Sequence, residues 1–420
     1  MPEETACSRS WSSAQAADAS PAPEPEATKW WQPDTNPQPG VGTNFEQEVR
    51  QLSRLLACSH NDAELPKVID QGVVEAHCTK LRQAMQGYRD DFLSKAVPFF
   101  AKIRPKNLPP AVVYPFGGGD LASALTAFPD GLEYTTISLE FSGDPRPILK
   151  QANKKRLETA LDLIQQSSAT LLRGDWNWTR NMQASQEAGA PEQLAYALIA
   201  LVVHNYEPIS LRYFHLDRDG TIKYVDDEFI AKNEGKQPKR TRNWGPDPAW
   251  SPAFSNMEIR FKNPDSDGPV KVYRHIAANL SDDYLTTDRN HLTKDPSLLT
   301  HLSGKREVSA LTRAASHLLW MDSFSLIREY LMKHIVWMPS DSTGLPPLFA
   351  RQAGLKQDTY GIFTAAYEPS DQGKRRAYND EFVALFKSNP QKPLDFLWGY
   401  PDNAKNAHMI VTYRPELVQR

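Results

Sequence analysis

Residues 110–146 of this 420-residue chain read PAVVYPFGGGDLASALTAFPDGLEYTTISLEFSGDPR, and the order of elements in this stretch decides the fold. The run AVVYPF (111–116) is rich in β-branched and aromatic residues, as strands are, and its proline suits a strand end. Three glycines follow, and they allow backbone conformations that other residues avoid. Asp120 can then cap a helix over 121–128, where apolar residues recur at helical spacing.

A second strand, 134–141, follows the turn Pro-Asp-Gly and carries Glu140 near its end. Strand, glycine turn, helix, strand and acidic residue is the order of a Rossmann-like half-unit, in which helix amides and a carboxylate hold a nucleoside. The order predicts that the two strands are adjacent and parallel. It also predicts a site for S-adenosylmethionine or another nucleoside-containing ligand, formed by Gly117, Gly118, Gly119, Asp120, Glu140 and Arg146.

A purely structural interpretation of the same residues stays open. GGGD is not the G-x-G-x-x-G fingerprint, and three glycines before a helix cap can serve only to turn the chain from sheet to helix. Glu140 and Asp120 would bind one nucleoside only if the fold brings both to it. Arg146 would hold a ligand carboxylate only if its guanidinium is available for a bidentate contact.

Composition excludes some functions. A formal net charge of −3, with 24% charged residues, argues against a general nucleic-acid-binding protein. No apolar run approaches the length of a membrane span, and the acidic start MPEETACSRS is not a signal peptide. The protein is therefore expected in the cytoplasm if this start is native, and exported or lipid-anchored if a leader was removed.

Motifs for catalysis and metal binding are missing from the chain. Its ten histidines form no HExxH, HxH or Cys/His zinc pattern, and neither a GxSxG elbow nor a P-loop occurs. The sequence thus assigns no metal site and no catalytic residue. Cys58 and Cys78 can pair, but two separate buried thiols are the favoured expectation.

The chain divides into four regions around the central stretch. Residues 1–43 have the composition of a disordered leader, in which Trp30 and Trp31 are the only residues suited to dock on the body. Region 44–205 holds the Rossmann-like unit and helices expected at 44–57, 73–100, 147–172 and 192–203. Pro98 should kink or end the helix expected at 73–100.

Beyond the α/β unit the pattern changes to alternation. The segments 209–226 and 257–275 each read as a β-hairpin around an Asp-x-Asp-Gly turn, so region 206–290 predicts an antiparallel meander. Both turns loosely match a calcium loop, but turn-forming Asp and Gly explain them without calcium. The basic loop 231–250 between the hairpins is expected to be solvated.

Region 291–420 predicts a C-terminal α/β part packed on the same body. Helices are expected over 307–321, from 324 through 335, and over 378–386, with a polar loop at 338–347. Strands are expected at 360–367 and 409–413. The whole chain is therefore predicted to be a mixed α+β protein, with an antiparallel meander and C-terminal helices added to the Rossmann-like unit.

Two segments of the chain resemble a family of uncharacterised bacterial proteins, many of them exported or lipid-anchored. The segments are 112–146, with its YPFGGGD turn, FP step and LE strand end, and 311–346, with its SFSLIR helix and STGLP loop. The match would cover most of residues 80–415. The resemblance implies a shared fold and no known activity, and this chain differs in lacking a leader.

Two classes of function remain after this reading. The slightly favoured class is a non-catalytic, envelope-associated module in which the glycines are structural. The other is an enzyme or binding protein for a small nucleoside ligand at the glycine turn. Side chains packed into that turn would favour the first class, and an open pocket facing Glu140 would favour the second.

Overall fold

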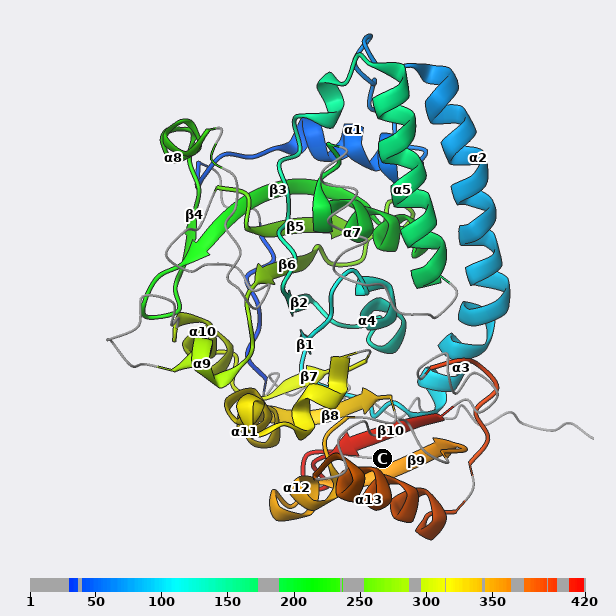
Figure 1. The fold of residues 1–420 in the computed structure, drawn as a ribbon, viewed down its shortest axis with the longest axis vertical. Helices are drawn as coiled ribbons and strands as arrows, with labels where there is room; N and C mark the ends of the chain where they lie inside the picture. The colour runs from blue at the N-terminus through cyan, green and yellow to red at the C-terminus, as the bar shows by residue number, and fades with distance from the viewer. Residues whose placement is uncertain are drawn as a thin grey trace, which may run out of the picture.

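The computed structural model describes residues 30–36, 40–172, 189–234, 236, 253–286, 296–313, 315–341, 344–363, 374–390, 392–398 and 408–418. A ten-stranded sheet, in the order β4-β3-β5-β6-β2-β1-β7-β8-β10-β9, runs through the whole body (Figure 1). The five central strands from β6 to β8 pair in parallel, and each flank pairs antiparallel. The fold is thus mixed α+β, as the sequence predicts.

The strands have the following bounds: β1 Ala111–Pro115, β2 Glu133–Ser138, β3 Glu207–Leu216, β4 Ile222–Tyr224, β5 Asn256–Lys262, β6 Lys271–Ala277, β7 Val308–Ala310, β8 Ile335–Ser340, β9 Lys356–Gly361 and β10 His408–Tyr413. The helices are α1 Glu46–Leu56, α2 Gln71–Tyr88, α3 Ser94–Ile103, α4 Leu121–Ala127, α5 Lys154–Leu172, α7 Glu192–Val203, α8 Asp227–Asn233, α9 Asp282–Leu285, α10 Ser297–Ser303, α11 Ser325–His334, α12 Pro347–Gln352 and α13 Lys374–Ser388.

The central unit β1–α4–β2 forms as the sequence predicts. β1 and β2 are parallel neighbours, with Ala111 opposite Glu133 and Pro115 opposite Ile137. All residues of both strands are buried; β1, AVVYP, accordingly reads as one mainly apolar run, whereas β2, EYTTIS, also buries a glutamate, two threonines and a serine. The two hairpins also form, β3 with β4 and β5 with β6, and they join each other through β3 and β5.

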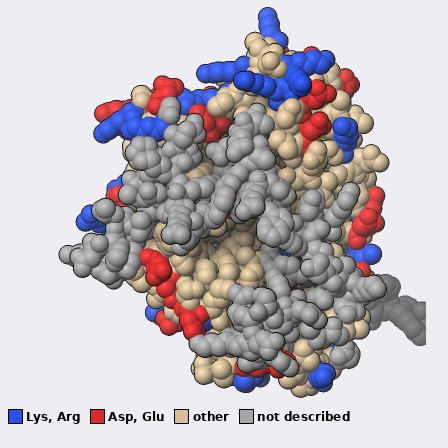
Figure 2. Space-filling view, in the orientation of Figure 1, with Lys and Arg blue, Asp and Glu red and all other residues tan. Residues whose placement is uncertain are grey.

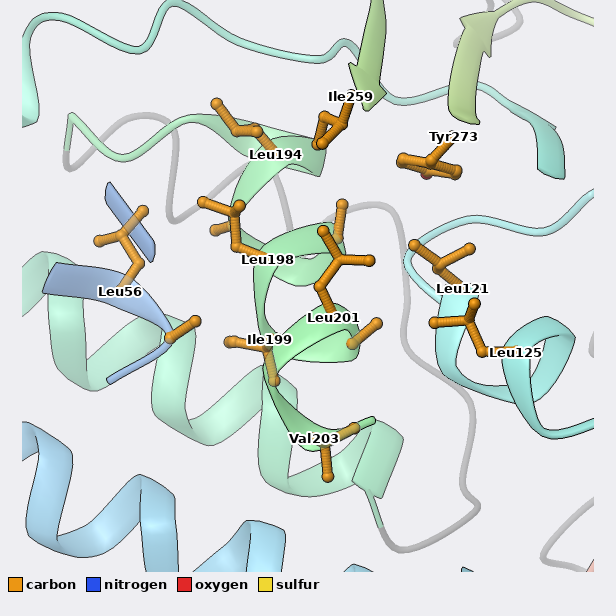
Figure 3. Close-up of a cluster of buried hydrophobic side chains, with 14 of the residues drawn as sticks. Leu56, Leu121, Leu125, Leu194, Leu198, Ile199, Leu201, Val203, Ile259 and Tyr273 are labelled. Carbon is orange, nitrogen blue, oxygen red and sulfur yellow. The ribbon is translucent and has the colours of Figure 1, made fainter. Parts of the chain in front are cut away.

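Helices cover both faces of the sheet. In Figure 1, α7, α4, α5 and α2 lie on one side of the sheet, and α9, α10 and α11 lie on the other. The apolar helix α7 is at the centre of the larger core, where Leu194, Leu198 and Leu201 meet Ile259 and Tyr273 from the sheet (Figure 3). The second core, under α10 and α11, is smaller.

Charged side chains gather at one end of the molecule. Figure 2 shows Lys and Arg at the upper end, over the N-terminal ends of α2 and α5. Lys154, Lys155 and Arg156 begin α5 there, and all three are exposed. None of the described helices is both long and apolar enough to cross a membrane.

One predicted helix is wrong. Residues 307–321 carry an apolar stripe at helical spacing, but the structure places Val308–Ala310 in β7 and Ala315–Trp320 in a short 3-10 helix. β7 fills the edge of β1, with Val112 opposite Ser309, and also pairs with β8. The backbone hydrogen bonds of this pairing outweigh local helical preference, which is a weak determinant.

Two other helix boundaries differ from the predicted ones. The helix expected over 147–172 begins only at Lys154, where the side chain of Asn153 accepts a hydrogen bond from the amide of Arg156. The helix at Pro98 continues to Ile103 after one π turn, Arg89–Leu93, because Phe100 is fully buried and holds its last turn in the core.

The C-terminal region has further boundary changes. The helix expected through 335 ends at His334, and Ile335 starts β8, which extends to Ser340 into the loop expected at 338–347. The strand expected at 360–367 is β9, which ends at Gly361, and residues 364–367 lie outside the described part. The strand at 409–413 and the helix at 378–386 are confirmed as β10 and α13.

The N-terminal region and the basic loop are described only in part. Trp30 donates from Nε1 to the carbonyl of Asn107 at 3.0 Å and is 9% exposed, so this residue docks on the body as expected. Most of the leader 1–43 and most of the basic loop 231–250 lie outside the described residues.

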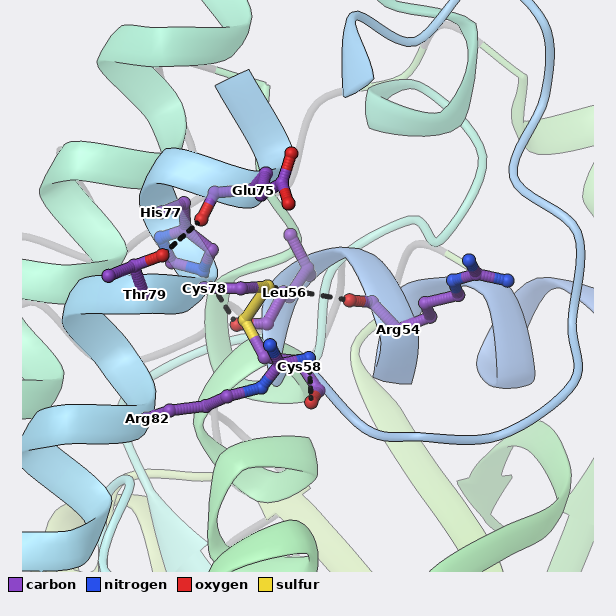
Figure 4. The surroundings of a disulfide bond; sticks show 8 residues. All are labelled: Arg54, Leu56, Cys58, Glu75, His77, Cys78, Thr79 and Arg82. Carbon is purple, nitrogen blue, oxygen red and sulfur yellow. Dashed lines mark hydrogen bonds between the residues drawn. A yellow bond between two sulfur atoms is a disulfide. The ribbon is translucent and has the colours of Figure 1, made fainter. Parts of the chain in front are cut away.

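Cys58 and Cys78 form a disulfide, so the expectation of two separate thiols is wrong. The sulfur atoms are bonded, and the bond ties the end of α1 to the middle of α2 (Figure 4). His77 lies beside it, with Nε2 3.1 Å from the carbonyl oxygen of Leu56. Sequence separation alone does not show that two helices cross at these positions. Pairing of the two cysteines was therefore not the favoured expectation.

Replacing Cys58 and Cys78 together by serine should lower the free energy of unfolding by about 3 kcal/mol, because the open chain gains entropy when a loop of this length is released. Urea denaturation of the double variant and of the parent, each with and without a thiol reductant, measures the difference. The reductant should shift only the parent. A parent whose urea midpoint is insensitive to reductant would contradict a stabilising disulfide.

Candidate functional site

The glycine turn after β1 is packed against aromatic and amide side chains. A Cβ atom at Gly117 would lie 2.9 Å from the ring of Tyr114, and one at Gly119 would lie 3.1 Å from Cβ of Tyr196 on α7. Gly118 has φ of +49°, and its carbonyl accepts a hydrogen bond from the side chain of Gln193. The turn therefore needs its glycines for close packing with α7 and for its backbone shape.

Asp120 is engaged by several groups of the protein. Its carboxylate accepts from the amide of Ser123, as a helix cap, and from the hydroxyl of Tyr114 at 2.9 Å. Its Oδ2 also lies 3.1 Å from Nη1 of Arg313, which follows β7. Arg313 donates further to the carbonyl of Trp398 and lies over the Trp398 ring at 4.7 Å. This network links the turn after β1 to the segment that follows β7.

Glu140 lies in a different network, on the β6 side of β2. Its carbonyl oxygen is 2.8 Å from Nε2 of His275, so this nitrogen carries the proton. Nδ1 of His275 then accepts from the hydroxyl of Thr136, which is 2.8 Å from the hydroxyl of Tyr273. Burial lowers the pKa of His275 to about 4, and the hydrogen bond to Glu140 opposes this shift only in part.

Arg146 is held by its own neighbour. Its guanidinium contacts both carboxylate oxygens of Asp144, with Nη2 at 2.7 Å from Oδ2, and it lies 5.1 Å from the ring centre of Phe254. Asp144 thus occupies the bidentate position that a ligand carboxylate would take. The structure places the six predicted residues on one edge of the sheet, but Asp120 pairs with Arg313, Arg146 is held by Asp144, and Glu140 meets His275 through its backbone carbonyl.

A site that the sequence did not predict lies on the face of the sheet covered by α10. We call it the buried charge cluster, and it comprises Glu133, Glu258, Arg260, Arg274 and Lys305. Glu133 contacts Nη1 of Arg274 at 2.5 Å and also the ammonium of Lys305. Glu258 contacts Nε of Arg274 at 2.8 Å and Nε of Arg260 at 3.0 Å. All five residues are less than 8% exposed.

Electrostatics keep Glu133 of this cluster ionised. Burial acts to raise the pKa of Glu133, but attraction by Arg274 and Lys305 outweighs it, and the pKa lies well below its usual range. Burial lowers the pKa of the Lys305 ammonium, and the attraction of Glu133 opposes that shift. The two guanidinium groups stay charged at any accessible pH.

A cavity of about 430 Å³ opens beside the buried charge cluster. Arg260, Arg274 and Lys305 line it, together with His301 and the aromatic ring of Trp31. The remaining lining residues come from the turn after β3, strand β4, α10 and the N-terminal segment: Asp34, Asp219, Gly220, Thr221, Ile222, Tyr224, Thr300 and Gly304. This volume is in the range of small-molecule sites.

Two residues that line this cavity each have a buried side-chain atom with no hydrogen-bond partner among the described residues. The atoms are Nη1 of Arg260 and Nε2 of His301. Buried polar groups in native proteins almost always have partners, so such atoms need an explanation, which a ligand or an ordered water would supply. Asp34 and Asp219, the other acids of the lining, are exposed.

A larger cavity, of about 960 Å³, lies at the opposite end of the sheet, between α3 and β9. Aromatic side chains, including Trp337 and Tyr360, line it, and Lys392 there pairs with Asp358 at 3.5 Å. Every buried side-chain nitrogen and oxygen of its described lining residues has a partner. It therefore gives no comparable sign of a missing ligand.

Sequence reasoning missed the buried charge cluster although one signal was present. The hairpins β3–β4 and β5–β6 alternate between apolar and polar residues, which is typical of a sheet with one face in water. Glu258, Arg260 and Arg274 stand on that presumed outer face, yet they are buried. Opposite charges at facing strand positions, such as Glu258 and Arg274, are the signal that could have suggested a buried polar face.

Comparisons with protein-family models, with curated proteins and with solved structures found no match to this chain. The resemblance to a family of bacterial proteins therefore stays a prediction.

Replacing Asp120 by asparagine should lower the free energy of unfolding by about 3 kcal/mol, because it removes a carboxylate charge that pairs with the buried guanidinium of Arg313. Asparagine still caps α4, so loss of the cap does not explain the effect. Urea denaturation measures it, and adding Arg313→Met should recover part of the loss. An Asp120→Asn protein as stable as the parent would show that the Asp120–Arg313 ion pair does not stabilise the fold.

Lowering the pH from 7.5 to 5 should destabilise the protein through its buried histidines. Burial lowers the folded pKa of His204, His275 and His301 to about 4, 4 and 3, from 6.5. The unfolded chain then binds more protons below pH 6.5, so stability falls as the pH falls. Each histidine contributes a slope of about 1.4 kcal/mol per pH unit.

Urea denaturation at several pH values measures this slope, and His275→Gln should reduce it by one histidine's share. His60, which is exposed, serves as the matched control, and His60→Gln should leave the slope unchanged. Equal stability of the parent at pH 7.5 and pH 5 would contradict neutral buried histidines.

Proposed function

We propose that this protein is a non-catalytic binding module that recognises a small carboxylate or phosphate in the cavity beside the buried charge cluster. The observation that carries the proposal is Nη1 of Arg260, which is buried and has no acceptor among the described residues. Arg260 is 2% exposed and lines the cavity. A ligand oxygen there would accept the hydrogen bond that the protein leaves unmade.

The charge balance of the cluster supports an anionic ligand. Arg260, Arg274 and Lys305 contribute three cationic groups, and Glu133 and Glu258 contribute two carboxylates. A buried charge without a counter-charge is costly, and a bound anion removes that cost. Arginine suits this role because its planar donors match the oxygens of carboxylates and phosphates.

The glycine turn is structural in this proposal. Tyr114, Gln193 and Tyr196 pack into it, Asp120 pairs with Arg313, and Arg146 is held by Asp144. The helix that follows the turn, α4, has seven residues. These contacts support a structural role over the alternative, in which S-adenosylmethionine or another nucleoside binds at Gly117–Gly119 and Glu140.

The disulfide supports a location outside the reducing cytoplasm. Disulfides between buried cysteines persist in oxidising compartments and are rare where thiols are kept reduced. The proposal therefore places the module in the cell envelope or outside the cell, in agreement with the bacterial family that the sequence resembles.

The proposal predicts that small anions stabilise the protein against heat. Citrate, phosphate and sulfate, each compared with chloride at equal ionic strength, should raise the melting temperature, and a ligand at a hundred times its Kd adds about 2.7 kcal/mol. Arg260→Met should abolish the shift. Lys262→Met is the matched control, because Lys262 lies two positions further along the same strand, is exposed and does not line the cavity.

Two results would contradict the proposal. One is the absence of any shift with the anions, and the other is an equal shift in the parent and in Arg260→Met. S-adenosylmethionine and adenine nucleotides belong in the same screen. A shift with one of them that Glu140→Gln removes would favour the nucleoside site instead.

A further inference from the structure

His301 gives the cavity a hydrogen-bond acceptor. Its Nδ1 lies 3.0 Å from the carbonyl oxygen of Gly220, and a carbonyl can only accept, so Nδ1 carries the proton. Nε2 is then an unprotonated acceptor. It is buried, and no donor among the described residues reaches it.

The position of His301 is fixed by packing as well as by this hydrogen bond. Gly220 has φ of +77°, and a Cβ atom there would lie 2.5 Å from the backbone nitrogen of His301. The turn between β3 and β4 thus lies directly against α10. Burial, and repulsion by Lys305, lower the pKa of His301 to about 3, so the imidazole is neutral at physiological pH.

Two residues that line the cavity therefore carry a donor and an acceptor that no other described residue uses. Arg260 offers a charged N–H, and His301 offers a lone pair. A simple carboxylate or fully ionised phosphate can only accept hydrogen bonds, so it would satisfy Arg260 and leave His301 without a donor. A hydroxyl group on the ligand would satisfy His301.

We propose that the ligand is a hydroxylated small anion, such as a sugar acid or a sugar phosphate, whose anionic group binds Arg260 and whose hydroxyl donates to Nε2 of His301. This inference rests on the proposed function, because it assigns the substrate class of the same cavity. The cavity volume of about 430 Å³ accommodates a ligand of monosaccharide size.

Trp31 adds an aromatic ring to the cavity, which suits a hydroxylated small anion. Its indole ring lines the cavity, and the ammonium of Lys305 lies 5.2 Å from the ring centre. The ring face is a flat apolar surface beside charged and polar groups, and it can pack against the C–H face of a sugar. A cavity that combines a cation, an acceptor and an aromatic ring suits a polar ligand with an apolar face.

Matched ligand pairs test the hydroxyl contact on the unaltered protein. Gluconate is compared with hexanoate, and glycerol 3-phosphate with propyl phosphate, by isothermal titration in the same buffer. The hydroxylated member of a pair should bind about tenfold more tightly, because its partner leaves a buried acceptor unpaired. The two pairs also distinguish a carboxylate from a phosphate as the anionic group.

Variants assign the preference to His301. His301→Leu should bind both members of a pair equally, because it removes the acceptor and keeps the cationic groups. His334→Leu is the control, since His334 is a partly buried histidine that does not line the cavity, and it should retain the tenfold preference. Arg260→Met should weaken binding of both members.

The outcomes separate this inference from the proposed function. Equal binding of hydroxylated and plain anions by the parent overturns the hydroxyl contact and leaves anion recognition standing. A preference that survives in His301→Leu overturns the role of His301. Failure of all four anions to bind the parent, which the thermal screen with citrate, phosphate and sulfate would also show, overturns the proposed function and this inference together.

Discussion

The structure depends on the pairing of β1 with a strand on each side. β1 is buried along its whole length and lies between β2 and β7, so nearly every backbone group in it must be satisfied by a parallel neighbour. β2 arrives from α4 next along the chain, whereas β7 comes from almost two hundred residues later. β1 is therefore paired on both sides only when the C-terminal region has docked. The N-terminal and C-terminal regions thus form one cooperative sheet.

The two faces of the sheet are packed by different kinds of interaction. On the face covered by α7, apolar side chains meet apolar side chains, and the free energy comes from burial of area. On the other face, apolar packing under α11 gives way to the buried charge cluster beside α10. Burying an ion pair in a protein interior costs desolvation free energy. The pair stabilises the protein only if every donor and acceptor in it has a partner. Unmatched atoms there are consequently better indicators of a ligand than unmatched atoms at the surface.

Local rules predicted the elements whose hydrogen bonds are local. The Asp120 cap and the two hairpins formed where the residues indicated them, because each needs only neighbouring residues. The helix predicted over 307–321 is wrong for the opposite reason. Its apolar stripe suits a helix, but the open edge of β1 needs a strand at Val308–Ala310, and no local pattern reports a distant edge.

By itself the sequence determined the β1–α4–β2 unit, the buried helix α7 and the antiparallel hairpins, since periodicity and turn residues act over short distances. Only the tertiary structure decided which polar residues meet. The Cys58–Cys78 disulfide, the Asp120–Arg313 pair and the contact of Lys305 with Glu133 join residues 20, 193 and 172 positions apart. Such contacts follow from how helices and strands pack, and one sequence does not encode their geometry in any local pattern.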